Sequence, residues 1–537
     1  MKNRFASCIN SLKNSASLFD KKSVDKKTDL LKTCSKLTLP GGKKLLEYHD
    51  LLLFTCAYPG SKSLKAGAEK ELKRIATYAR QHQHTKKALI ENEGLPFANI
   101  VTRFSPDFLY WLLQQKDLQV AFDSFYNPSL SLNDILNITL PPVLKAETTA
   151  GLENAALLEV LNIKPSQYVS FLLGQLRELA DRPLLKELFI ERMDLYVKLI
   201  PRNSKFSRAF NRIPIKQPYL HHELLKKFDP EQLLNEPLPA VAKPTNAERE
   251  QYFRVIRNAM ALTVREIDPA TFLQVESMRL YKLDRGLVLA VYSMQAERQL
   301  PLETYFGFTF FKNGIPVAYG GVWVFGAMAK TGLNIFDPFR GGESGFLLCQ
   351  LIRIFKQHFG VRYIEIEPSQ FGLDNPDGIR SGAFWFYHKY GFRPVDPVLN
   401  ALAAKEHIQI KRKKNYRTNG DTLVRFTESN LGVLLEGKKP VNVIEITTKI
   451  LTVIKGSWQN NYEAARNAAI VQFCNKVKMD RNSLSSSEKK VLEDIALWAM
   501  AMNIRKTRQL QLMKEMVFAK TSDDYGYQKL LLDFFSK

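Results

Sequence analysis

The sequence has few cysteines and lacks any long hydrophobic run, and these two deficits exclude several classes of protein. The five cysteines among 537 residues are odd in number, widely spaced and never arranged as C-x-x-C. This pattern argues against a disulfide framework or a zinc ribbon, and it favours a reducing compartment, so we expect a cytoplasmic protein. No stretch reaches the roughly 18 apolar residues that a membrane-spanning helix needs, and the N-terminus lacks the apolar core of a secretory signal. We therefore expect no membrane span.

Basic residues, by contrast, are in excess, and the formal net charge is +23. Such a charge favours partners that carry phosphate, such as nucleic acid, anionic lipid or a phosphorylated cofactor. The positive charge is spread along the chain rather than gathered in one stripe, which is equally typical of a lysine-rich surface. The run Lys411-Arg412-Lys413-Lys414, in a predicted loop, is typical of a nucleic-acid or localisation patch and also of a solvated loop. A nucleic-acid partner therefore stays an open alternative.

The length predicts two to four domains, because a single hydrophobic core seldom grows so large. Residues 1–234 form a predicted mainly helical N-terminal region, and residues 440–537 form a predicted helical C-terminal region. At the start of the first region, the pattern predicts a loosely ordered or short-helical lead over 1–45. Amphipathic helices are predicted over 62–82 and 183–200, with an irregular stretch between them over 127–149. A proline-dense linker over 235–244 precedes the central domain.

The central region, residues 246–437, begins with a predicted helix and then changes to strand periodicity. Asn313-Gly314 lies between two alternating apolar runs, which is the strongest short-range signal for a β-hairpin. We expect an α/β (α+β) fold with a central mixed, mostly antiparallel sheet and flanking helices. The expected strands cover 274–283, 286–294, 305–311, 315–325, 333–336, 361–367 and 422–427, and the expected helices cover 246–267, 344–359 and 379–390.

A glycine-rich turn, Arg340-Gly341-Gly342-Glu343-Ser344-Gly345, joins a predicted strand to a predicted helix. Backbone N–H groups at a helix N-terminus, together with the helix dipole and a nearby guanidinium, can bind a phosphate or pyrophosphate. The turn lacks the Gly-Lys-Ser/Thr of a P-loop, and the preceding strands are predicted to be antiparallel, unlike those before a dinucleotide fingerprint. A tight connection, with Ser344 as N-cap and Arg340 as a surface charge, remains the alternative.

A second motif lies about forty residues later, where Ala383, Phe386, Tyr387 and Lys389 precede Gly391-Phe392 at a predicted helix end. With the hairpin, the glycine turn and this order of elements, the chain resembles the GNAT superfamily of N-acetyltransferases. It also resembles a group of large, uncharacterised bacterial GNAT-like proteins with FRGGES and SGAFWFY signatures. The resemblance covers roughly residues 246–437, and its motifs are specific within 334–394.

The resemblance implies acetyl-CoA, or another acyl-CoA, as co-substrate and requires no metal. The pantetheine arm would lie between the strands predicted at 333–336 and 361–367, and the Tyr387 hydroxyl would protonate the departing thiolate. The turn amides would hold the pyrophosphate while a guanidinium adds positive charge. The implied binding residues are Arg340, Gly341, Gly342, Ser344, Gly345 and Arg380.

A general base must take a proton from the attacking amine. Glu365 and Glu367 share one face of a predicted strand, and we favour Glu367, at the strand end, over Glu365 and Asp337. Glu343 stands where the family's pattern has glycine, and Arg380 stands where many members have asparagine. We expect Glu343 to pair with Arg340 or Arg380, or to act on substrate itself.

These features predict transfer of an acyl group, most simply acetyl, to an amine by direct attack. Two alternatives remain open: aminoacyl transfer from charged tRNA on the same fold, and a non-catalytic GNAT-like domain used for binding or as a scaffold. The acceptor is not specified by the sequence. His82 with His84, and His221-His222-Glu223, lack a third ligand at fitting spacing, so we expect no metal site.

Overall fold

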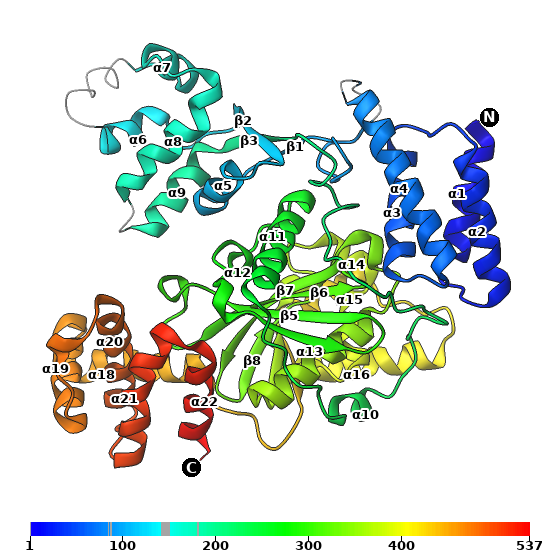
Figure 1. Ribbon diagram of the computed structural model, residues 1–537. Helices are drawn as coiled ribbons and strands as arrows, with labels where there is room; N and C mark the ends of the chain where they lie inside the picture. Colours follow the sequence, from blue (N-terminus) through cyan, green and yellow to red (C-terminus); the bar gives the residue numbers. More distant parts are fainter. Residues whose placement is uncertain (1, 84, 86–88, 141–150, 180–181, 537) are drawn as a thin grey trace.

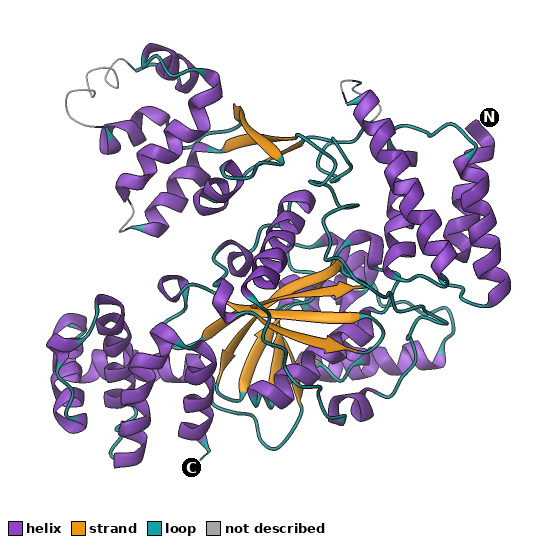
Figure 2. Ribbon diagram, viewed as in Figure 1, coloured by secondary structure: helices purple, strands orange, loops and turns teal. Residues whose placement is uncertain are grey.

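The chain combines helices and strands, as the sequence predicts, with helices in the majority (Figures 1 and 2). The computed structural model describes residues 2–83, 85, 89–140, 151–179 and 182–536. Along the chain follow a group of helices, a small unit with its own sheet, a central sheet and a C-terminal helical bundle.

The N-terminal helices pack side by side at one edge of the molecule (Figure 1, blue). The Asp20 and Ser61 side chains cap α2 and α4 by accepting backbone N–H groups of Ser23 and Leu64. Of the two alternatives predicted for residues 1–45, a loosely ordered or a short-helical lead, the structure has the short helices, and α1 and α2 bury apolar side chains against their neighbours. The helices are α1 (Lys2–Ser15), α2 (Lys21–Ser35), α3 (Lys43–Ala57) and α4 (Lys62–His82).

Residues 100–201 form a small unit in which a sheet of order β1-β3-β2 carries helices, and the sequence did not predict this sheet. The helix predicted over 183–200 ends at Asp194, whose φ is +48°, and the chain continues as a strand with alternating burial. The stretch 127–149 holds a helix, and its last residues, 141–149, lie outside the described residues. The elements are β1 (Ile100–Thr102), α5 (Pro106–Leu113), β2 (Leu118–Phe125), α6 (Leu132–Thr139), α7 (Asn154–Val160), α8 (Tyr168–Leu176), α9 (Pro183–Met193) and β3 (Leu195–Pro201).

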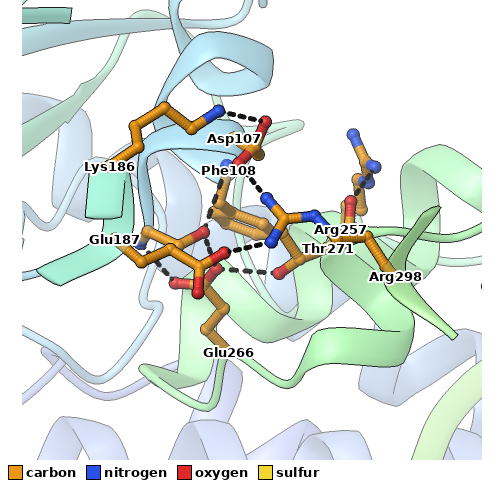
Figure 3. A network of polar contacts seen from close by, with 9 residues as sticks. Asp107, Phe108, Lys186, Glu187, Arg257, Glu266, Thr271 and Arg298 are labelled. Carbon is orange, nitrogen blue, oxygen red and sulfur yellow. Dashed lines mark hydrogen bonds and ion pairs between the residues drawn. The ribbon is translucent and has the colours of Figure 1, made fainter. Parts of the chain in front are cut away.

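A network of polar contacts fastens this unit to the central domain (Figure 3). The Arg298 guanidinium forms ion pairs with Asp107 at 3.0 Å and with Glu187 at 2.6 Å. The Glu266 carboxylate accepts the Thr271 hydroxyl at 2.7 Å and the Ser105 amide at 2.9 Å. Since these contacts cross from α5 and α9 to the central domain, they fix the orientation of the small unit.

The central sheet has the strand order β11-β12-β10-β8-β7-β6-β5-β4, with β9 paired to β7. The neighbours are antiparallel except for β8 and β10, which run parallel. Asn313 and Gly314, with φ of +48° and +79°, form the predicted hairpin turn. The strands are β4 (Arg279–Leu283), β5 (Leu287–Ser293), β6 (Thr304–Lys312), β7 (Ile315–Phe325), β8 (Met328–Thr331), β9 (Asn334–Ile335), β10 (Tyr363–Ile366), β11 (Arg393–Pro394) and β12 (Leu431–Leu434).

Three sequence-based assignments in the central domain are wrong. The single helix predicted over 379–390 is divided at Gly382, whose φ is +66°, into α14 and α15. Residues 422–427, predicted as the last strand, belong largely to helix α17, and the last strand is β12. Lys411 and Arg412, predicted in a loop, end the helix α16. The helices are α10 (Pro230–Asn235), α11 (Asn246–Thr263), α12 (Asp268–Thr271), α13 (Ser344–Phe359), α14 (Pro376–Ser381), α15 (Ala383–Lys389), α16 (Pro397–Arg412) and α17 (Gly420–Phe426).

The C-terminal region is helical, as predicted, and it encloses a hydrophobic core of its own. Gln528 joins it to the central domain by donating to the carbonyls of Gly326 at 2.6 Å and Phe359 at 2.7 Å. Of the residues that the structure describes, none lies in a helix long and apolar enough to cross a membrane. The helices are α18 (Val443–Trp458), α19 (Tyr462–Val477), α20 (Ser486–Ala501), α21 (Thr507–Ser522) and α22 (Asp524–Phe535).

Candidate functional site

The candidate site lies where two parallel strands separate. β8 and β10 are paired up to Thr331 and Ile366. Beyond Thr331 the chain keeps its register along β7 through β9, since Asn334 lies opposite Tyr319. β10 instead ends and turns into the 3₁₀-helix Pro368–Gln370. The backbone groups of the segment 332–336 that face away from β7 therefore have no neighbouring strand on that side.

Tyr387 and Gln370 lie against the chain just beyond the end of β8. The Gln370 amide lies against Gly332, where any side chain would collide with it. Tyr387 is a buried residue of α15, and its phenol lies at the Leu333 backbone amide. Burial raises the pKa of Tyr387 to about 12, although the Leu333 amide acts in the opposite direction. The phenol therefore remains protonated at neutral pH and can donate a proton at this point.

The glycine turn begins α13 with backbone donors available. Glu343, rather than Ser344, occupies the N-cap position, and no side chain caps the helix. The Gly342 amide donates to Phe339 and the Leu347 amide to Glu343, but the amides of Ser344 and Gly345 find no acceptor among the described residues. Two adjacent amides at a helix N-terminus are the donor set that a phosphate requires.

The glycines of the turn differ in how closely other groups approach them. A Cβ atom on Gly341 would meet open space, whereas one on Gly342 would lie 2.8 Å from the Tyr58 hydroxyl. A Cβ atom on Gly345 would overlap the Tyr390 hydroxyl. Two phenols thus flank the turn and leave Gly341 as its open side.

Glu343 is buried in an ion cluster that the sequence did not predict. Its carboxylate accepts the Lys312 ammonium at 2.6 Å, the Arg285 guanidinium at 2.6 Å and the Leu225 amide at 2.9 Å. Both Lys312 and Glu343 are essentially inaccessible to solvent. Burial alone would raise the pKa of Glu343, but Lys312, Leu225 and Arg285 together hold it below its usual value.

The expected partners of Glu343 are therefore corrected. Arg340 is exposed and forms an ion pair with Asp337 at 2.7 Å, and Arg380 is exposed and pairs with Asp377 within α14. The cations that pair with Glu343 are instead Lys312 and Arg285, both distant in sequence from the turn. With this set of donors, Glu343 holds the turn in place and has no free oxygen directed at a ligand.

Three carboxylates lie on or beside the strands that lead up to the separation. Glu365 is buried and accepts Asn430 at 3.0 Å and Lys439 at 3.3 Å. Glu367, half-buried just after β10, forms no side-chain hydrogen bond or ion pair with a described residue. Glu303 was missed from the sequence, although its spacing of two from Tyr305 at the start of β6 is a signal that could have indicated it.

Glu303 has the environment of a proton acceptor. Burial raises the pKa of Glu303, and the negative charge of Glu367 raises it further. The positive charges of Lys330 and Lys520 lower it, but less than burial raises it. Glu303 lines a pocket of about 50 Å³ together with Trp323, Lys330 and Glu365. Because the charge of Glu367 contributes to the raised pKa of Glu303, the two carboxylates lie near each other.

Comparison with protein-family models, with curated proteins and with solved structures found no match. In the described part of the chain, no group of three or more His, Cys, Asp or Glu side chains is placed to hold a metal ion.

Proposed function

We propose that this chain is an acyl-CoA-dependent N-acyltransferase, which transfers an acyl group, in the simplest case acetyl, to an amine. The observation that carries the proposal is the placement of the Tyr387 phenol at the Leu333 amide, where β8 and β10 separate. The parallel pair is joined through a helix whose first amides lack acceptors among the described residues. This arrangement agrees with the motif resemblance to the GNAT superfamily.

The unpaired amides of Ser344 and Gly345 would bind the pyrophosphate of the donor, and Arg340 would add positive charge from the exposed rim. The acyl arm would then run into the separation between the strands. There the backbone groups of 332–336 that have no neighbouring strand would hydrogen-bond to its amides.

Transfer needs one base and one acid. The amine nitrogen attacks the thioester carbonyl, and Glu303 or Glu367 takes the proton that the nitrogen loses, directly or through water. The carbon–sulfur bond breaks, and Tyr387 gives its proton to the departing thiolate. The raised pKa of Glu303 suits a base that must accept a proton near neutral pH.

A second candidate, aminoacyl transfer from charged tRNA, is favoured by the exposed cations at the end of α16. The two candidates differ in the donor that they need, so they can be separated directly.

The test is an acylation assay with the full-length chain, acetyl-CoA and a panel of primary amines, read by thiol release and by product mass. The proposal expects both signals, in equal amounts, with at least one amine. The second candidate would be favoured if acetyl-CoA gave neither thiol release nor acylated product, while charged tRNA gave an aminoacylated product. Absence of both would leave a non-catalytic domain.

A further inference from the structure

A pocket of about 630 Å³ opens on the side of the central domain formed by α15, α16 and the residues that follow α16. The rings of Trp385, His407 and Tyr416 line it, and the Trp385 and His407 rings stack with their centroids 6.0 Å apart. Trp385 is held in place by donating its indole N–H to Thr418 at 3.1 Å. The aromatic floor is thus built and fixed rather than formed by loose surface side chains.

The rim of the same pocket is positively charged. Lys389, Arg393 and Arg417 line it, and none of the described residues that line it is acidic. His388 lies below the rim, where burial, with Arg393 and other nearby cations, lowers its pKa to about 4. The histidine is therefore neutral at pH 7, and the arginines and lysine carry the charge.

The positive charge continues beyond the pocket along the end of α16. Lys411, Arg412, Lys413 and Lys414 are exposed and form no ion pair with any residue that the structure describes. Glu406, the nearby acid, is occupied by accepting the Tyr416 hydroxyl at 2.9 Å. Residues 381–426 contain nine Lys and Arg but three Asp and Glu: Lys389, Arg393, Lys405, Lys411, Arg412, Lys413, Lys414, Arg417 and Arg425 against Asp396, Glu406 and Asp421.

We propose that this pocket and the adjoining cations form a binding site for single-stranded nucleic acid, which we call the α15–α16 surface: Trp385, Lys389, Arg393, His407, Lys411–Lys414, Tyr416 and Arg417. Aromatic rings beside a row of cations are the combination that binds an unpaired strand, because bases stack on the rings while phosphates follow the charges. A duplex keeps its bases stacked inside and cannot place one in the pocket. The proposal does not depend on the acyltransfer reaction.

The first test measures the affinity of the full-length chain for fluorescent 12-nucleotide RNA and DNA strands by anisotropy. Replacing Lys411, Arg412, Lys413 and Lys414 by glutamine should weaken binding at least tenfold and flatten its salt dependence, by about 0.7 in the logarithmic slope for each lost phosphate contact. A matched control replaces Lys21, Lys22, Lys26 and Lys36, which are exposed on and beside α2, by glutamine. The control removes the same charge and should change affinity less than threefold.

The second test separates stacking from charge. Tyr416→Leu removes a ring from the pocket and should weaken binding about tenfold, whereas Tyr416→Phe keeps the ring and should bind like the wild type. RNA bound more tightly than DNA would assign the site to RNA, and equal affinity would assign it to either single strand.

Three results would overturn the proposal. Equal losses in the two charge variants would mean that the whole basic surface attracts nucleic acid without a site. Equal affinity for a duplex of the same length, or no effect of Tyr416→Leu, would remove the pocket from the interaction. If a mononucleotide, added at a concentration equal to that of the protein, displaced the strand completely, the pocket would be a small-molecule site instead.

Discussion

Two carboxylates, Glu343 and Glu303, lie in the central domain in opposite situations. Glu343 is buried and its oxygens accept Lys312, Arg285 and the Leu225 amide, so its pKa falls below the usual value. Glu303 is partly buried with weaker compensation by Lys330 and Lys520, so its pKa rises. The comparison indicates that burial alone does not make a carboxylate reactive. The number of donors directed at it decides between a structural and a chemical role.

This difference divides the candidate site into two parts. The turn at the start of α13 is held by a saturated ion cluster and offers its backbone amides to a ligand. Two groups with raised pKa values can exchange protons here: Tyr387 lies at the separation of β8 and β10, and Glu303 lies in a pocket beside the paired part of these strands.

The largest expected effect is on stability, at the structural carboxylate. Glu343→Gln leaves Lys312 and Arg285 buried without a counter-charge, which should lower the free energy of unfolding by about 3–5 kcal/mol. Chemical denaturation at pH 7 measures this loss. Asp377→Asn, which breaks the exposed pair with Arg380, is the control and should cost about 0.5 kcal/mol or less.

The same variant has a defined pH dependence. The folded-state pKa of Glu343 is lowered, so its contribution to stability is present above its ordinary value of 4.5 and is lost as the pH falls through the folded value. The difference between wild type and Glu343→Gln should therefore shrink in acid. A loss below about 1 kcal/mol at pH 7 would contradict the structural role.

The next effect is on the rate of transfer. Tyr387→Phe keeps the buried ring and removes the proton donor, so we expect kcat for acyl transfer to fall about a hundredfold with little change in stability. Steady-state kinetics with acetyl-CoA and an accepted amine measure it. An unchanged rate would show that the thiolate is protonated by another group.

A smaller effect is expected for Glu303→Gln, because Glu367 lies nearby and can take part of the role. We expect a loss of roughly tenfold in kcat/KM at neutral pH. In the wild type, activity should fall as the pH drops through the raised pKa of Glu303, since only the ionised form accepts a proton. In Glu303→Gln, this fall in activity at low pH should be absent. Glu297→Gln, which changes an exposed carboxylate outside the candidate site, should leave the profile unchanged.

The smallest effect concerns the exposed rim of the turn. Arg340→Ala should weaken acetyl-CoA binding about fivefold, because an exposed charge contributes about 1 kcal/mol. Arg508→Ala, an exposed arginine of α21, is the matched control. If Arg380→Ala weakens binding more than Arg340→Ala does, the cofactor runs along α14 instead of the turn.

Local patterns predicted the central domain better than the rest of the chain. The Asn313-Gly314 hairpin and the helix Ser344–Phe359 depend on neighbouring residues, and both are where the sequence indicated. The helix at 422–426 and the sheet containing β3 were missed, since their short apolar runs fit either structure and tertiary contacts decide.

In the candidate site, too, the features carried by local sequence motifs were predictable and the long-range contacts were not. The glycine turn and Tyr387 are carried by contiguous motifs, and they lie on elements that adjoin the separation of β8 and β10. The partners of Glu343 come from β6 and from the turn before β5, 31 and 58 residues away, so no local pattern could name them. Glu303 owes its raised pKa to burial by several elements, among them the C-terminal region that contributes Lys520.

The most direct test of the central claim is a calorimetric titration of the full-length wild-type chain with acetyl-CoA. We expect saturable binding at one site per chain, weakened about fivefold in Arg340→Ala and unaffected by Arg508→Ala. No heat of binding and no stabilisation at millimolar acetyl-CoA would contradict the claim that the α13 turn and the separated strands form an acyl-CoA site.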